Sequence, residues 1–254
     1  MDDVTRHPLL VFALSFIALW LSAWIGALFR KRRRGPVEDL HEDFGVILTA
    51  TLTLLALIIG FSFSMAITRY DQRKNLEEEE ANAVGTEYLR AELLSATDAA
   101  KVRALLRTYL DQRVLFYTTR DERELQQISA RTAQLQDELW SMVRAPTAAQ
   151  PPGIVVLAVW GMNDVLNSQG YTQAAWWNRI PFAAWVLMTA IAICGNLLVG
   201  YVLQSTRSGA LLLLVLPLVV SIALMLIADI DSPRYGFIQV HPKNLISLGE
   251  SLRR

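Results

Sequence analysis

Four long apolar runs determine what this chain can fold into. The first, Pro8–Phe29, holds 22 residues without a charged side chain. An α-helix rises ~1.5 Å per residue, so such a run reaches ~33 Å and crosses a hydrocarbon core of ~30 Å. The other three runs are Phe44–Thr68, Pro181–Leu203 and Gly209–Ala228. The sequence therefore predicts a polytopic membrane protein with four transmembrane helices, whose first partner is the lipid bilayer.

Composition excludes several classes of protein. The chain is 53% hydrophobic and its formal net charge is +0, so it lacks the basic surplus that nucleic-acid binding needs. It has one cysteine, and its three histidines are far apart in the sequence. We therefore predict neither a metal site nor a bound cofactor. No Gly-rich phosphate loop, GxSxG or HExxH motif is present, so we do not expect an enzyme.

The segment 69–180, between the second and third runs, is predicted to be helical because no strand-like alternation occurs in it. We expect the second helix to continue to about Leu94 and a helix Asp98–Thr118 capped by Thr97. A turn beginning at Thr119 or Arg120 should lead into a further helix, whose apolar stripe runs from Leu125 to Met142. After a loop at Pro146–Gly153, a short helix is expected over Ile154–Ser168. The fold class is therefore all-α. The expected parts are 1–68, an extramembrane domain at 69–180, two further spans within 181–228, and a tail at 229–254.

The orientation prediction depends on the basic run Arg30–Arg34. Short loops rich in Lys and Arg stay in the cytoplasm, which places residues 30–43 there, in a bacterial inner (plasma) membrane. The segment 69–180 and both termini are then outside. This segment has basic residues of its own near the membrane, but long segments translocate largely regardless of charge.

One face of the second span combines hydroxyl and apolar side chains. At ~100° per residue, a narrow arc of this helix carries Thr53, Leu57, Phe61, Ser64 and Thr68, with Gly60 beside it. Such a face can line a pore, because hydroxyls replace ion hydration and an apolar ring controls wetting. It can also be a packing face, because small residues let membrane helices approach closely.

A run of four glutamates follows on the same helix. On a helix Glu77–Glu80 sweep ~300°, so at least one of them must point toward a packed neighbour unless the helix is wet all round. The run is either a solvated, salt-bridged surface or the lining of an aqueous vestibule that symmetry copies would turn into an acidic ring. The residues assigned to this vestibule or to ion contact are Asp71, Glu77, Glu78, Glu79, Glu80, Asp229 and Asp231.

Asp229 and Asp231 close the fourth span, at the membrane face from which 69–180 emerges. Carboxylates in such a place could hold Ca²⁺, although no EF-hand spacing is present. Pairing with Arg69, Arg73 or Arg234 is the alternative.

Several motifs resemble the bacterial bestrophin-like family of membrane proteins. The resemblance covers nearly the whole chain in order. The segments that carry it are Gly60–Ala66, Arg69–Arg73, Glu80–Ala83, Leu89–Arg90, Arg179–Pro181 and Ala228–Gly236.

The resemblance implies a distant relation to bestrophins, pentameric anion channels whose second transmembrane helix lines the pore with an apolar neck. Carried over, that neck corresponds to Thr53, Leu57 and Phe61. The sequence differs at Thr53, where a bulky apolar residue is expected, and at Tyr70, where bestrophins have paired tryptophans. We therefore predict a homo-oligomeric channel for inorganic ions, with the second span lining the pore. The alternative is a non-conducting membrane scaffold or sensor whose helical domain binds a protein partner.

Overall fold

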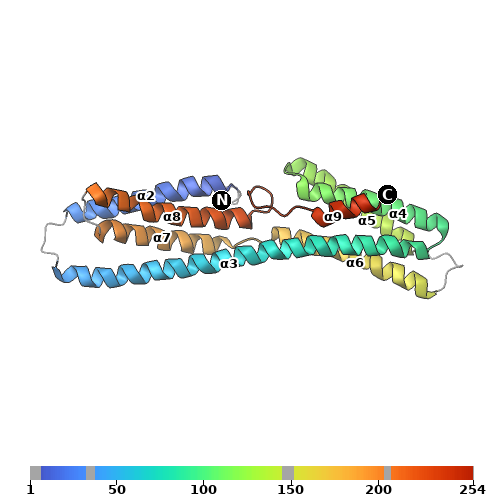
Figure 1. Ribbon diagram of the computed structural model, residues 1–254, viewed down its shortest axis with the longest axis horizontal. Coiled ribbons are helices and arrows are strands. Elements are labelled where there is room, and N and C mark those ends of the chain that lie inside the picture. The colour runs from blue at the N-terminus through green and yellow to red at the C-terminus, as the bar shows by residue number, and fades with distance from the viewer. Residues whose placement is uncertain (1–6, 33–37, 145–151, 203–206, 254) are drawn as a thin grey trace. The chain divides into compact units, whose positions relative to one another are not determined.

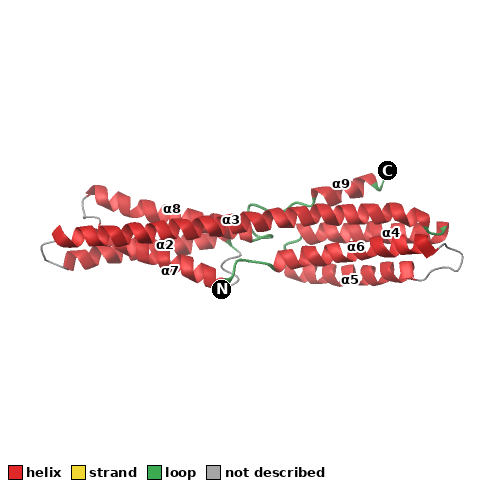
Figure 2. Cartoon of the chain, turned by 90° about the horizontal axis from the view of Figure 1, so that it is seen from below, coloured by secondary structure: helices red, strands yellow, loops and turns green. Residues whose placement is uncertain are grey.

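The chain is mostly helical in the residues that the computed structural model describes, which are 7–32, 38–144, 152–202 and 207–253. No strand occurs in these ranges, which confirms the all-α prediction. Figures 1 and 2 show the helices. Their bounds are α2 Pro8–Arg32, α3 Glu38–Arg90, the 3₁₀ turn η1 Ala91–Leu93, α4 Ala96–Thr118, α5 Glu122–Arg144, α6 Pro152–Trp177, α7 Phe182–Val202, α8 Arg207–Asp231 and α9 Lys243–Ser251.

The chain divides into two compact units. Unit 1 comprises Met1–Thr68 and Arg179–Gln239, and unit 2 comprises Arg69–Asn178 and Val240–Arg254. The long helix α3 contributes its first part to unit 1 and its second part to unit 2. The segment 229–254 was predicted as one tail. In the structure, residues 229–239 belong to unit 1 and residues 240–254 belong to unit 2.

Four helical stretches of the described chain are long and apolar enough to cross a membrane, as predicted. They are Pro8–Arg30, Gly45–Leu93, Val156–Val202 and Leu213–Asp231. The second stretch has 49 residues, or ~74 Å of helix, which is more than twice the thickness of a hydrocarbon core. Because its uncharged part ends at Thr68, we take 45–68 as its spanning part.

In unit 1, α2 packs against α7 and α8 through small residues. A Cβ atom added to Gly200 of α7 would overlap the carbonyl oxygen of Ala23 in α2. Gly26 of α2 lies equally close to the backbone of Leu197. The Ser22 hydroxyl donates a hydrogen bond of 2.7 Å to the carbonyl of Ile193. Small side chains therefore let the two helices approach until their backbones touch, as is common in membrane bundles.

Unit 2 has an apolar core built from helices distant in sequence. Buried leucines and valines of α4, α5 and α6 meet there, including Leu106, Leu110, Leu135, Leu139 and Val165. Their spacing by three and four within each helix gives each one a buried stripe.

Two predicted helix boundaries are wrong. The N-cap of α4 is Ser95, whose hydroxyl accepts a 3.2 Å hydrogen bond from the Asp98 amide, and Thr97 lies inside the helix. The helix predicted to end at Ser168 continues to Trp177, because Thr172, Ala175 and Trp176 are buried and extend its packed face. Most of the predicted loop, 145–151, lies outside the described residues.

Candidate functional site

The residues predicted to line a pore all lie on an exposed face of α3 in unit 1. Every one of them is exposed: Thr53, Leu57, Gly60, Phe61, Ser64 and Thr68. We call these six residues the α3 strip. Its largest side chain, Phe61, is 63% accessible. The Thr68 hydroxyl donates to the Ser64 carbonyl at 3.0 Å, so part of the strip's polarity is directed toward its own helix.

The opposite face of the same helix is buried. Leu55, Ser62 and Ala66 are between 0% and 8% accessible. Near them, a Cβ atom on Gly195 of α7 would lie 3.3 Å from the Leu52 side chain. The packing face of α3 is therefore on this side, and the packing interpretation of the α3 strip is not realised within a single chain.

The four consecutive glutamates divide into two buried and two exposed side chains. Glu78 and Glu79 are exposed, whereas Glu77 and Glu80 are 1% and 0% accessible. The geometric expectation that at least one points inward is therefore met. The buried pair lies in the core of unit 2, which contradicts a vestibule lining for Glu77 and Glu80 because their oxygens are occupied by partners from other helices.

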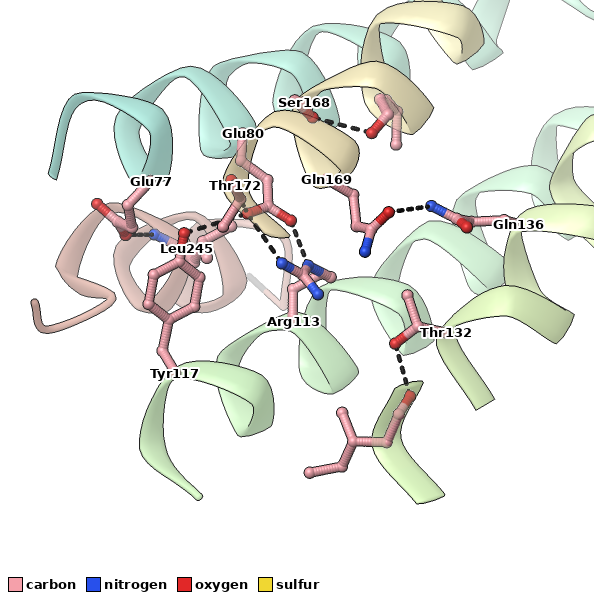
Figure 3. A network of polar contacts seen from close by, with 12 residues as sticks. Glu77, Glu80, Arg113, Tyr117, Thr132, Gln136, Ser168, Gln169, Thr172 and Leu245 are labelled. Carbon is pink, nitrogen blue, oxygen red and sulfur yellow. Dashed lines mark hydrogen bonds and ion pairs between the residues drawn. The ribbon is translucent and has the colours of Figure 1, made fainter. Parts of the chain in front are cut away.

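Glu80 is the centre of a buried polar network, shown in Figure 3. Its carboxylate forms an ion pair with Arg113 of α4, whose Nη2 also lies 3.4 Å from Oε2. The hydroxyls of Tyr117 and Thr172 donate to the same Oε2 at 3.3 Å and 3.2 Å. One carboxylate thus joins α3, α4 and α6. Beside it, Gln136 of α5 donates to Gln169 of α6 at 3.4 Å.

This network shifts the pKa of Arg113 and of two tyrosines. Burial is the largest single influence and lowers the pKa of Arg113, but Glu80, Tyr109 and Tyr117 together raise it above its ordinary value. Burial, followed by the Glu80 charge, raises the pKa of Tyr117 and of Tyr109. Arg113 therefore stays charged, and both tyrosines keep their protons near neutral pH.

Glu77 and Arg73 bind the ends of two other helices. The Glu77 carboxylate accepts from the amides of Asn244 and Leu245 at 2.9 and 3.0 Å, and from Asn244 Nδ2 at 2.7 Å. These amides belong to the first turn of α9, where unpaired N–H groups favour a negative charge. Arg73 donates to the carbonyls of Ala175 and Asn178 at the end of α6. Both side chains are buried, so neither lies on a solvated surface of α3.

Asp229 and Asp231 serve a similar purpose in unit 1. Asp229 accepts from the amides of Phe237 and Ile238 at 2.6 and 3.0 Å, and Asp231 accepts from the Ile180 amide at 3.1 Å. The two aspartates are 2% and 5% accessible. They therefore hold the turn after α8 and the start of α7, and they do not face open solvent within one chain. Their assignment to a vestibule is not supported by this burial.

Asp71 is exposed in unit 2, like Glu78 and Glu79. In the described part of the chain, no three His, Cys, Asp or Glu side chains gather as a metal site requires. The prediction that the chain binds no metal or cofactor stays a prediction, and so does its alternative, Ca²⁺ at Asp229 and Asp231.

Sequence reasoning missed the partners of the charged residues. Arg73, Glu77, Glu80, Val84 and Glu87 recur at spacings of three and four, and all are buried. This is the periodicity of a helix core stripe, but with charge where apolar residues are usual. Arg113 shares its stripe with the buried apolar residues of α4. A charged residue at a core position of a helical stripe is the sequence signal that could have indicated a buried charged partner.

The sequence matches the Bestrophin-like domain family over residues 10–245. No curated protein sequence matches the chain. Among solved structures, a single-substitution variant of a bacterial bestrophin homologue from Klebsiella pneumoniae is similar, with a TM-score of 0.69 and 12% identity over 95% of this chain and 97% of that one. The structure of that homologue solved by zinc phasing gives a TM-score of 0.68 at 12% identity, covering 94% and 96%. The TM-scores show a shared fold.

Proposed function

This chain belongs to the bestrophin-like family, and from this premise we propose that it forms a homo-oligomeric ion channel whose pore is lined by the α3 strip. The observation that carries the proposal is the exposure of all six strip residues while the opposite face of α3 is buried. A packed oligomer would bring copies of this strip around a common axis.

The chemistry of the α3 strip suits a narrow pathway. Phe61 and Leu57 form an apolar stretch that would control wetting, and Thr53, Ser64 and Thr68 place hydroxyls on either side of it. In the described part of unit 1, the strip is exposed at all six of its residues. Its side chains are therefore free to contact ions and water in an assembly.

Three exposed carboxylates are proposed to contact ions outside the membrane. Asp71, Glu78 and Glu79 are exposed in unit 2 and are not used as helix caps. Negative charges near a pathway raise the local concentration of cations. We assign the acidic contact to these three residues and leave out Glu77, Glu80, Asp229 and Asp231, because their oxygens bind the protein itself.

Flux from liposomes containing purified protein tests the proposal. We expect ion flux that requires the protein, from an assembly larger than a dimer in detergent. A stable, correctly assembled preparation that passes no inorganic ion would contradict it. The double variant Glu78→Gln, Glu79→Gln should shift the reversal potential toward anions. The matched variant Glu122→Gln, Glu124→Gln, which neutralises two exposed positions near the start of α5, should shift it less.

A non-conducting scaffold or sensor is the second candidate, and one observation favours it. Unit 2 exposes large apolar side chains on α6: Trp160 is 66% accessible, and Val156 and Leu157 about half. Exposed apolar surface on a soluble part of a protein often marks a binding surface. Recovery of one stoichiometric protein partner, lost in Trp160→Ala, together with an absence of flux, would support this function over the channel.

The proposal includes an orientation of the chain in the membrane. We propose that residues 30–43, which include the basic run Arg30–Arg34, lie in the cytoplasm and that unit 2 lies outside a bacterial plasma membrane. Labelling of single cysteines introduced at exposed positions of unit 2, with a membrane-impermeant reagent on intact cells, tests this orientation. Labelling only after the membrane is broken would reverse it.

A further inference from the structure

Glu87 differs from the other buried glutamates of α3. Its side chain is 0% accessible, and neither carboxylate oxygen has a hydrogen-bond partner. Glu77 and Glu80 lie on the same buried stripe, but each receives hydrogen bonds from other helices. A buried carboxylate without donors is costly when ionised. Glu87 is therefore the one of these three that has no donor to stabilise an ionised carboxylate.

The carboxyl group of Glu87 lies against α6. It faces Gly161 of α6, and a Cβ atom at Gly161 would overlap both Glu87 Oε2 and Arg90 Nη1. The neighbouring residues of α6, Ala158, Met162 and Val165, are each 0% accessible. The contact between the two helices is thus formed across this carboxyl, with glycine opposite it and apolar side chains around it.

The charges near Glu87 come from the helices on each side. Arg90 of α3 is on the same helix, and Asp164 of α6 faces it from the other. Glu92 of η1 and Arg103 of α4, the next charged residues at this end of the unit, form an ion pair with each other. Arg103 also lies over the Tyr88 ring.

Burial is the largest influence on this carboxyl. It raises the pKa of Glu87 to about 8; Arg90 opposes the rise and Asp164 adds to it. The protonated form is neutral and suits a buried contact. The ionised form requires water or a donor, and the Arg90 guanidinium, although it lies beside the carboxyl at Gly161, forms no hydrogen bond with it.

We propose that Glu87 is a proton-binding site that controls how closely α3 and α6 pack at Gly161. When the carboxyl is protonated, the two helices close on it. When it loses its proton, water enters to solvate the charge and the contact loosens locally. The proposal concerns unit 2 alone and does not depend on whether the protein conducts ions.

Hydrogen exchange of the intact protein in detergent, from pH 6 to 10, tests this proposal once exchange is corrected for the intrinsic effect of pH. Peptides covering 84–91 and 156–165 should lose protection with a midpoint near pH 8. Glu87→Gln should remove this transition. Glu124→Gln, at an exposed position of α5, should leave it unchanged. A wild-type protein without a transition, or the same transition in Glu87→Gln, would overturn the proposal.

Two further variants keep the test decisive if Glu87→Gln does not fold. Asp164→Asn removes a negative charge and should lower the midpoint, whereas Arg90→Gln removes a positive charge and should raise it. Opposite shifts in these two variants identify Glu87 as the titrating group. A midpoint that neither variant moves would assign the transition to another group and contradict the proposal.

Discussion

Glu80 and Arg113 form an ion pair inside unit 2, with side chains that are 0% and 2% accessible. The two residues are 33 positions apart and lie on different helices. Two hydroxyls complete the carboxylate's contacts. Taking both charges out of water costs free energy, so such a pair contributes little net stability. Removing only one partner is strongly destabilising, because the other charge then stays buried without a partner.

Glu80→Gln should therefore destabilise the protein by ~3–5 kcal/mol, because Arg113 keeps its charge in a buried site. Thermal unfolding in detergent, monitored by tryptophan fluorescence, measures the change. The double variant Glu80→Leu, Arg113→Met should recover most of the loss, because it leaves no buried charge unpaired.

The control for that experiment is an exposed ion pair of the same unit. Arg131 and Glu138 of α5 lie 3.6 Å apart, and both side chains are nearly half accessible. Glu138→Gln should change stability by less than ~1 kcal/mol. Equal losses in Glu138→Gln and Glu80→Gln would contradict the structural role assigned to Glu80.

Glu77→Ala should release the start of α9. The substitution removes the acceptor of the amides of Asn244 and Leu245, a capping loss of ~1–2 kcal/mol. Limited proteolysis should then cleave the C-terminal segment faster than in the wild type. Glu78→Ala, one residue further at an exposed position, should not change the cleavage rate. Equal protection of α9 in both variants would mean that Glu77 does not cap it.

Gly200→Ala tests the backbone contact between α2 and α7. The added methyl group would overlap the Ala23 carbonyl, which belongs to the backbone and cannot move aside alone. We expect a loss of at least ~1–3 kcal/mol, seen as a lower unfolding temperature in detergent. Gly45→Ala adds the same methyl group to α3 where nothing lies within 4 Å, so its unfolding temperature should not fall.

The stability of the protein should decline with pH because of Glu87. Its pKa is raised to about 8 from the ordinary 4.5, so the folded state holds a proton that the unfolded state has lost. The contribution is therefore fully present below pH 4.5 and is lost as the pH rises toward 8. Unfolding temperatures measured across this window should fall less steeply in Glu87→Gln. An identical slope in both proteins would show that Glu87 titrates normally.

The membrane-spanning character of the chain could be predicted from sequence because it depends on local composition. The uncharged run Pro8–Phe29 needs only its length to predict a span. Helical geometry, which is also local, groups Thr53, Leu57, Phe61, Ser64 and Thr68 on one face of the second span, and the pore-lining role of this face stays a prediction. Helix α6 was predicted too short because its second half is polar. The burial of that second half against α3 depends on residues distant in sequence, so the residues of α6 alone could not indicate it.

The partners of the charged residues could not be predicted because they depend on tertiary packing. Glu77 to Glu80 have the same side chain in the sequence, and only the contacts of α3 with α4, α6 and α9 divide them into structural and exposed pairs. Glu77 binds residues 167 and 168 positions away. No local pattern encodes such a distance, although the three-and-four spacing of Arg73, Glu77 and Glu80 marks a buried stripe.

The most direct test of the central claim compares Phe61→Ala with Phe63→Ala in single-channel recordings from planar bilayers. Both residues are exposed phenylalanines of α3, but Phe63 lies ~200° further around the helix, off the α3 strip. If the strip lines the pore, Phe61→Ala widens its apolar part and should increase leak current or conductance several-fold, whereas Phe63→Ala should match the wild type. Unchanged currents in Phe61→Ala, or equal effects of the two substitutions, would contradict a pore lined by this face.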